Sequence, residues 1–150
     1  MAHYQASMES GRSAADTFDY LARFSNAAEW DPGVVAGEQL DPDPVGEGTR
    51  FRLELAFLGR RVSLTYLITQ YVPGREVVLA AEGRLLKSTD RITVTAQGAV
   101  ARVHYDADVR LQGPLGLLDP LLNRGFRTAA DRAAAGLARA LSTEHVPQAG

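Results

Sequence analysis

The sequence predicts an α+β domain in which a curved antiparallel sheet of seven strands surrounds one long C-terminal helix. Two observations support this fold class. Between residues 34 and 111, successive segments alternate apolar and polar residues, which is typical of strands with one buried and one exposed face. The segment Pro120–Leu141 follows, and its apolar and small residues recur every three or four positions, as in a helix packed on one side. Because no other segment is long enough to cover the sheet, we expect the strands to wrap around this helix.

The N-terminal part of the chain predicts one strand and two short helices. Gly11 interrupts a weak alternation, Ser13 can cap the helix that follows, and Asp31-Pro32-Gly33 stops the second helical turn. The expected elements are a strand at His3–Glu9, a helix at Ala14–Phe24 and a helical turn from Asn26 to Trp30.

Turn signals divide the middle of the chain into six strands. Pro73-Gly74 and Gln97-Gly98 are examples, because proline and glycine adopt the backbone angles that tight turns need. The expected strands are Val34–Leu40, Thr49–Leu58, Arg61–Val72, Glu76–Glu82, Leu86–Ala96 and Val100–Leu111.

The C-terminal helix carries a stripe of unusually small residues. Asp119 is the expected N-cap, and Pro120 suits the first helical position because no N–H is needed there. A glycine inside a helix costs ~1 kcal/mol relative to alanine, so the small residues need a reason. Either the helix approaches its neighbours closely, or the small residues leave room for a ligand. The residues concerned are Gly125, Ala129, Ala133 and Gly136.

The composition narrows the class of protein. With 45% hydrophobic and 23% charged residues, the chain is an ordinary globular one, and we expect one domain over residues 1–150 with an ordered core of about 3–141. The net charge of −2, with both signs scattered, indicates neither a nucleic-acid surface nor a membrane surface. The sequence shows no signal peptide and no long apolar run, so we expect a cytoplasmic protein without a membrane span.

Metal and covalent chemistry have little support in the sequence. There is no cysteine, and the three histidines, His3, His104 and His145, do not show the spacing of metal ligands. No serine lies in a nucleophile motif, and no glycine-rich loop suits a phosphate. We therefore expect no metal and no cofactor.

One carboxyl group falls on an apolar strand face. Along Leu86–Ala96, the alternation puts Ser88 and Asp90 on the same face as Ile92 and Val94. A buried carboxyl needs hydrogen-bond partners or a raised pKa, and either suits a general acid or a ligand anchor. The alternative is that Asp90 lies at the open end of its strand and only satisfies a neighbouring group.

Two tyrosines, Tyr66 and Tyr105, also lie on apolar strand faces. Each brings an apolar ring and one hydroxyl that can orient a ligand, although ordinary core packing is an equal alternative. In an enzyme, we expect Asp90 to transfer a proton while the tyrosines hydrogen-bond a substrate oxygen. The expected ligand-binding residues are Trp30, Phe51, Leu53, Leu55, Leu64, Ser88, Phe126, Ala129 and Ala133.

Several segments together resemble a known family. They are Phe18–Asn26, Glu29–Val34, Gly46–Phe51, Tyr66–Arg75 and Gly113–Leu118. These segments resemble the START-like helix-grip superfamily (SRPBCC), and more narrowly its polyketide cyclase/dehydrase branch, over roughly residues 3 to 141. The resemblance implies the helix-grip form of the fold predicted above. It also places Trp30 in a short helix that closes the mouth of a cavity.

Three functions are compatible with the sequence and the resemblance. The first, which we expect, is binding of a hydrophobic small molecule, polyketide- or lipid-like, by a monomer or homodimer. The second is a cofactor-independent cyclase or dehydratase that acts on a polyketide. The third is an interaction domain whose interior is filled. The matched segments are turns, caps and core positions, so they carry no catalytic signature.

Overall fold

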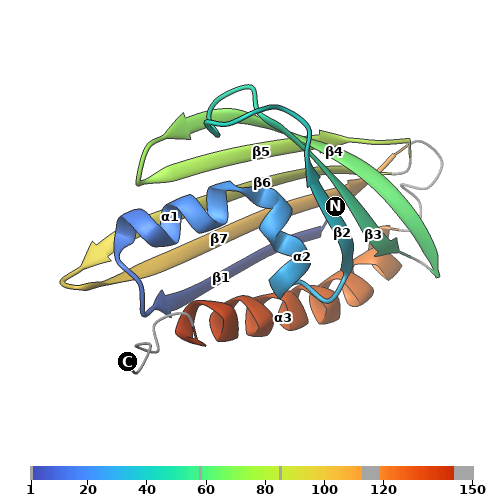
Figure 1. Ribbon diagram of the computed structural model, residues 1–150. Helices are drawn as coiled ribbons and strands as arrows, with labels where there is room; N and C mark the ends of the chain where they lie inside the picture. Colours follow the sequence, from blue (N-terminus) through green and yellow to red (C-terminus); the bar gives the residue numbers. More distant parts are fainter. Residues whose placement is uncertain (1, 58, 85, 113–118, 144–150) are drawn as a thin grey trace.

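Seven strands form one antiparallel sheet in the computed structural model, which describes residues 2–57, 59–84, 86–112 and 119–143. Their order across the sheet is β1-β7-β6-β5-β4-β3-β2, so β1 joins β7 and the other strands follow the chain. The predicted fold class is confirmed (Figure 1). The strands are β1 (Ala2–Ser10), β2 (Val34–Gln39), β3 (Arg50–Phe57), β4 (Arg60–Val72), β5 (Glu76–Glu82), β6 (Leu86–Gln97) and β7 (Val100–Leu111).

The helical segments of the described chain are α1 (Ala14–Ala22), the 3-10 helix η1 (Phe24–Asn26), α2 (Ala27–Trp30) and α3 (Asp119–Thr143). Ser13 caps α1 as predicted, because its Oγ accepts the N–H of Asp16 at 3.1 Å. α1 ends before the predicted Phe24, because Arg23 (φ −79°, ψ 82°) leaves the helical conformation and η1 follows. α3 begins one residue before the predicted start and ends two residues after the predicted end. The side chain of Asp119 lies outside the described ones, so its capping role stays a prediction.

The alternation along the strands corresponds to burial in the fold. The clearest case is β6, where alternate side chains are buried while those between them are exposed or partly exposed. The same face of the sheet carries the buried side chains of β4 and β7. The buried residues of β6 are Leu86, Ser88, Asp90, Ile92 and Val94.

Three helices together cover the concave face of the sheet. Register shifts in the β2–β3 and β4–β5 ladders mark β-bulges, which bend strands and increase twist. Figure 1 shows α1 crossing β6 and β7 while α3 runs along β1, in agreement with their contacts. A helix of 25 residues is ~37 Å long, and α3 contacts β1 at one edge of the sheet. The short helices α1 and α2 therefore cover the remaining surface that α3 was expected to cover alone.

Short-range contacts fix these helices on the sheet. The hydroxyls of Ser10 and Thr17 form a buried hydrogen bond of 2.7 Å that joins β1 to α1. Gly37 lets β2 approach η1, since a Cβ at this position would lie 2.6 Å from the carbonyl oxygen of Ser25. These contacts thus hold α1 against β1 at one edge of the sheet and η1 against β2 at the other edge.

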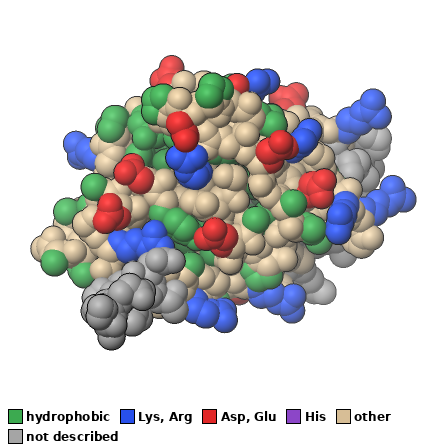
Figure 2. Space-filling model, viewed as in Figure 1, with side chains coloured by type: hydrophobic (Ala, Val, Ile, Leu, Met, Phe, Trp, Pro, Cys, Tyr) green, Lys and Arg blue, Asp and Glu red, His purple; other side chains and the backbone are tan. Residues whose placement is uncertain are grey.

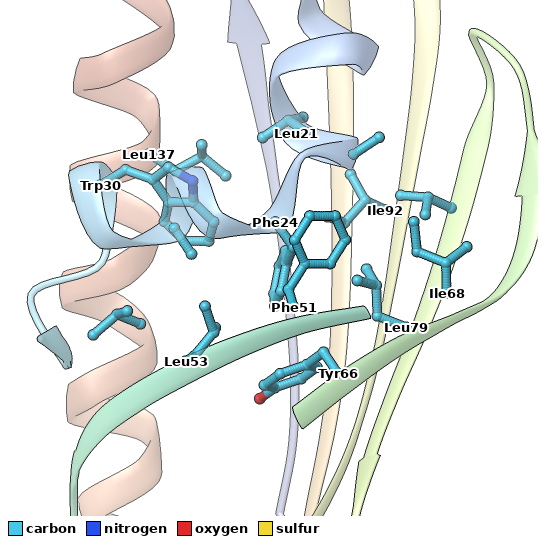
Figure 3. Packing of buried hydrophobic residues seen from close by; sticks show 14 of the residues in the cluster. Leu21, Phe24, Trp30, Phe51, Leu53, Tyr66, Ile68, Leu79, Ile92 and Leu137 are labelled. Carbon is cyan, nitrogen blue, oxygen red and sulfur yellow. The ribbon is translucent and has the colours of Figure 1, made fainter. Parts of the chain in front are cut away.

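One half of the interior is filled by side chains from many elements. Figure 3 shows Leu21 of α1 and Phe24 of η1 facing Ile68, Leu79 and Ile92 from the sheet. Each of these five side chains is at most 3% exposed. These side chains fill this part of the interior, and Phe24 also borders the cavity on the side of α3.

The surface mixes charges of both signs. Figure 2 shows positive and negative side chains interspersed over this face of the molecule. Among the described helices, none combines the length and the apolar character that crossing a membrane requires. The extent of the domain, its cytoplasmic location and its oligomeric state stay predictions.

Candidate functional site

A cavity of about 410 Å³ lies between α3, α2 and the concave face of the sheet. This volume is within the range of small-molecule sites, ~300–1,000 Å³. Side chains from β1, β3, β4, β6 and β7 line it on one side, and α2 and α3 line it on the other. Most of its walls are apolar. The expected binding residues that line it are Trp30, Leu53, Leu55, Ser88, Phe126, Ala129 and Ala133, together with Tyr66, Asp90 and Tyr105.

The small residues of α3 have different surroundings at different points of the helix. A Cβ on Gly136 would lie 2.0 Å from the carbonyl oxygen of Trp30, so this glycine permits close packing of α3 on α2. A Cβ on Gly125 would meet no atom within 4 Å, and Gly125, Ala129 and Ala133 all line the cavity. Close packing therefore accounts for Gly136, whereas Gly125, Ala129 and Ala133 border open space.

Two residues expected in the wall do not reach the cavity. Phe51 is 0% exposed and Leu64 is 1% exposed, and neither is among the residues that line the cavity. Phe51 lies on β3, which η1 contacts, and Leu64 packs beside Gly83, where an added Cβ would lie 2.7 Å from Leu64 Cδ2, so both side chains contact other groups rather than open space. The expectation that Phe51 and Leu64 line the cavity is therefore wrong.

The polar end of the cavity is built around Asp90, which is 6% exposed. Asp90 lies in the middle of the sheet, opposite Leu79 of β5 and Ala107 of β7, so the alternative at an open strand end does not hold. The Ser88 hydroxyl donates to Asp90 Oδ1 at 2.8 Å, and the Tyr105 hydroxyl donates to Asp90 Oδ2. Burial raises the pKa of Asp90 to about 6, although the two hydrogen bonds act in the opposite direction.

The two tyrosines remain protonated at physiological pH. Burial and the neighbouring charge of Asp90 raise the pKa of Tyr66, and burial followed by Asp90 raises the pKa of Tyr105. Tyr105 also packs edge-to-face against Trp30, with ring centroids 5.9 Å apart. In Figure 3 the ring of Tyr66 turns its hydroxyl oxygen away from the filled core. Both phenols line the cavity near the same carboxyl group.

Sequence reasoning missed a second carboxyl group in the cavity, that of Asp31. Asp31 follows α2, and its Oδ1 accepts the N–H of Gly33 at 2.8 Å. Burial raises the pKa of Asp31, while the hydrogen bond from Gly33 lowers it. The sequence contains part of the evidence that Asp31 lies at the cavity, because Asp31 directly follows Trp30, the residue expected to close the cavity. The pattern Asp31-Pro32-Gly33 by itself predicts only a turn.

Two other features lie outside this cavity. A wider depression of about 990 Å³ is lined mostly by polar side chains such as Arg12, Asp16 and Asp43, so it lacks the apolar walls of a binding site. On the outer face of the sheet, His3 Nε2 lies 3.0 Å from Asp106 Oδ1 and Nδ1 lies 3.5 Å from Asp108 Oδ1. These side chains could share a cation, but they are already paired with each other. The absence of a metal stays a prediction.

Solved structures share this architecture. A START superfamily protein from Mycobacterium smegmatis superposes with a TM-score of 0.76 at 14% identity, over 94% of this chain and 97% of that one. The Zhui aromatase/cyclase from Streptomyces sp. R1128 gives 0.72 at 15% identity, over 99% and 97%. The protein TTHA0849 from Thermus thermophilus gives 0.75 at 15% identity, over 93% and 96%. At these identities the likeness shows the fold alone.

The sequence itself supports a family assignment. No curated protein sequence matches the chain. The profile of the family described as "Polyketide cyclase / dehydrase and lipid transport" matches residues 1–142. This match covers nearly the whole chain and confirms the resemblance found in the sequence segments. The chain therefore belongs to the polyketide cyclase / dehydrase and lipid transport family.

Proposed function

We propose that the protein binds a hydrophobic small molecule, polyketide- or lipid-like, in the cavity beneath α3. The observation that carries the proposal is the 410 Å³ volume between small residues of α3 and large apolar residues of β3. Ala129 and Ala133 face this volume from the helix, and Leu53 and Leu55 face it from the sheet. The family description, which includes lipid transport, supports the same function. The volume counts against an interaction domain with a filled interior.

Filling the cavity from α3 tests this function. We expect wild-type protein to take up N-phenyl-1-naphthylamine, an uncharged probe whose fluorescence rises in apolar surroundings. Ala133→Phe places a ring in the cavity and should abolish uptake. Ala135→Phe is the matched control, because Ala135 lies on the same helix, is exposed and does not line the cavity. Its uptake should equal that of wild type.

Cooperative thermal unfolding must be retained for the comparison to count, and Ala129→Phe replaces Ala133→Phe if the latter does not fold. Normal uptake by the folded Ala133→Phe or Ala129→Phe variant would show that the probe binds elsewhere. The small residues of α3 would then serve packing, and the proposed function would lose its main support.

A second function is favoured by the buried Asp90 and its contacts. This function is cofactor-independent proton transfer during cyclisation or dehydration of a polyketide. Asp90 would accept a proton from carbon next to a ketone, since a carboxyl with a pKa of about 6 can act as a base at neutral pH. Tyr105 already donates its proton to Asp90. Tyr66 is therefore the phenol better placed to donate to a substrate oxygen.

The base can be tested without knowing the substrate. In 5-nitrobenzisoxazole, a base removes the ring C–H proton, the C–H electron pair completes a nitrile, and the N–O bond breaks to release a phenolate. We expect catalysis that increases with pH through about 6, where Asp90 ionises. Asp90→Asn should lower the rate by ~10²-fold or more, as for loss of a general base. Unchanged catalysis in Asp90→Asn, or none in wild type, would refute this second function.

A further inference from the structure

The hydrogen bonds at the polar end of the cavity are arranged so that few protons remain for a ligand. The hydroxyl protons of Ser88 and Tyr105 are both directed at the carboxylate of Asp90. The Gly33 N–H is directed at the carboxylate of Asp31. What these groups still offer to a ligand is lone pairs on their oxygen atoms, because each carboxylate oxygen can accept more than one hydrogen bond. The cluster is therefore rich in acceptors, and the hydroxyl of Tyr66, which lines the same cavity, is the donor that it keeps for a ligand.

The charge at this end of the cavity has one sign. Asp31 and Asp90 both line the cavity, and both are largely removed from water. Among the described residues that line it, none is arginine, lysine or histidine. An anionic ligand would thus enter an apolar cavity next to carboxyl groups without a compensating cation, which is unfavourable.

We infer that the cavity selects apolar ligands whose polar end donates hydrogen bonds, such as an alcohol, a phenol or a protonated amine, and that it excludes carboxylates. This inference rests on the proposed function, because it assigns a ligand class to the same cavity. Its basis is the direction of the donated protons at Asp90 and the sign of the charges around it. A fatty acid, although apolar along its chain, is then a poor ligand.

Four probes of similar length separate the contribution of ligand charge from that of hydrogen-bond donation. Decylamine, decan-1-ol and decanoate differ in the charge and donor capacity of one end, and methyl nonyl ether is an isomer of decanol that only accepts. Each is titrated against bound N-phenyl-1-naphthylamine at about pH 7.5. We expect decylamine and decanol to displace the probe, and decanoate to bind at least ~10-fold more weakly than decylamine because of like charge. The ether should bind at least ~3-fold more weakly than decanol, as for one lost hydrogen bond.

The pH dependence of decylamine binding gives a second readout. The titratable groups facing Asp90 are Asp31, Tyr66 and Tyr105, with Asp106 contributing from the outer face. Decylamine stays protonated between about pH 7.5 and about pH 5, whereas Asp90, with a pKa of about 6, becomes neutral. Decylamine affinity should fall over this range while decanol affinity changes less.

Variants test whether the ligand preference depends on the two carboxyl groups of the cavity. Asp90→Asn should reduce the preference for decylamine over decanoate by ~10-fold, and Asp31→Asn should reduce it in the same direction. Glu9→Gln is the matched control, because it removes one negative charge from an exposed position on β1. Its preference should equal that of wild type.

The outcomes are distinguishable. If decanoate binds as tightly as decylamine, or if Glu9→Gln changes the preference as much as Asp90→Asn and Asp31→Asn, the ligand class is wrong while binding in the cavity stands. If wild type takes up neither N-phenyl-1-naphthylamine nor any of the four probes, the proposed function fails, and the ligand class fails with it. Because the probe series uses wild-type protein, the result does not depend on whether a variant folds.

Discussion

Ionisation of Asp90 is expected to destabilise the folded protein, and the structure gives the size of the effect. The pKa of this carboxyl rises from 3.8 to about 6 on folding, chiefly because of burial. A shift of about two units corresponds to ~3 kcal/mol, at ~1.4 kcal/mol for each unit. Because the folded-state pKa is raised, the folded state binds the proton more tightly than the unfolded chain. Stability is therefore lost as the pH rises from about 4 through about 6.

Asp90→Asn isolates this contribution. Asparagine has nearly the same shape and does not ionise, so the variant should lack the loss of stability between about pH 4 and about pH 7.5. The measurement is the free energy of unfolding in urea, followed by circular dichroism at several pH values. The difference between variant and wild type should change by ~3 kcal/mol over this range, with the variant gaining relative to wild type as the pH rises. Asp31 titrates in both proteins, so its contribution largely cancels.

Other carboxyl groups act in a separate pH window. Contacts with basic or amide side chains lower the pKa of Asp41, Asp43 and Asp106, so the stability that they provide is lost below about pH 4. The exposed variant Glu9→Gln should show no change between about pH 4 and about pH 7.5 relative to wild type. A difference between Asp90→Asn and wild type that stays constant across this range would refute the argument, because Asp90 would then ionise as it does in the unfolded chain.

Two further predictions concern the packing of the helices. Gly136→Ala should destabilise the protein by ~1–3 kcal/mol, because its Cβ would lie 2.0 Å from the carbonyl oxygen of Trp30. Gly125→Ala, with no atom within 4 Å, should be neutral or stabilising by up to ~1 kcal/mol in the same thermal unfolding measurement, and equal effects would contradict the packing described here. Ser10→Ala should cost ~1–3 kcal/mol, because it leaves the buried hydroxyl of Thr17 without its 2.7 Å partner. Ser142→Ala at an exposed site is the control, and a Ser10→Ala variant as stable as this control would contradict the role of the Ser10–Thr17 bond.

The sequence by itself determined the features that depend on local periodicity. The alternation along β6 placed Ser88 and Asp90 on the same face as Ile92 and Val94, and all four are buried. This works because side chains alternate across a strand whatever its neighbours are. The same reasoning holds for α3, whose small residues recur on one side of the helix. The type of each element, and the side to which each of its side chains points, therefore follow from nearby residues alone.

The tertiary structure decided which of these facing residues meet at the cavity. Phe51 and Leu64 face the interior as expected, yet η1 packs on the strand of Phe51 and Gly83 lies against Leu64, so neither side chain lines the cavity. Asp31 joins the site only because the turn after α2 packs beside Asp90 and the tyrosines. Gly125 and Gly136 look alike in sequence, but one faces the cavity and the other touches Trp30. Whether a residue reaches the cavity depends on the curvature of the sheet and on the distance of each helix from it. Contacts between distant parts of the chain determine both.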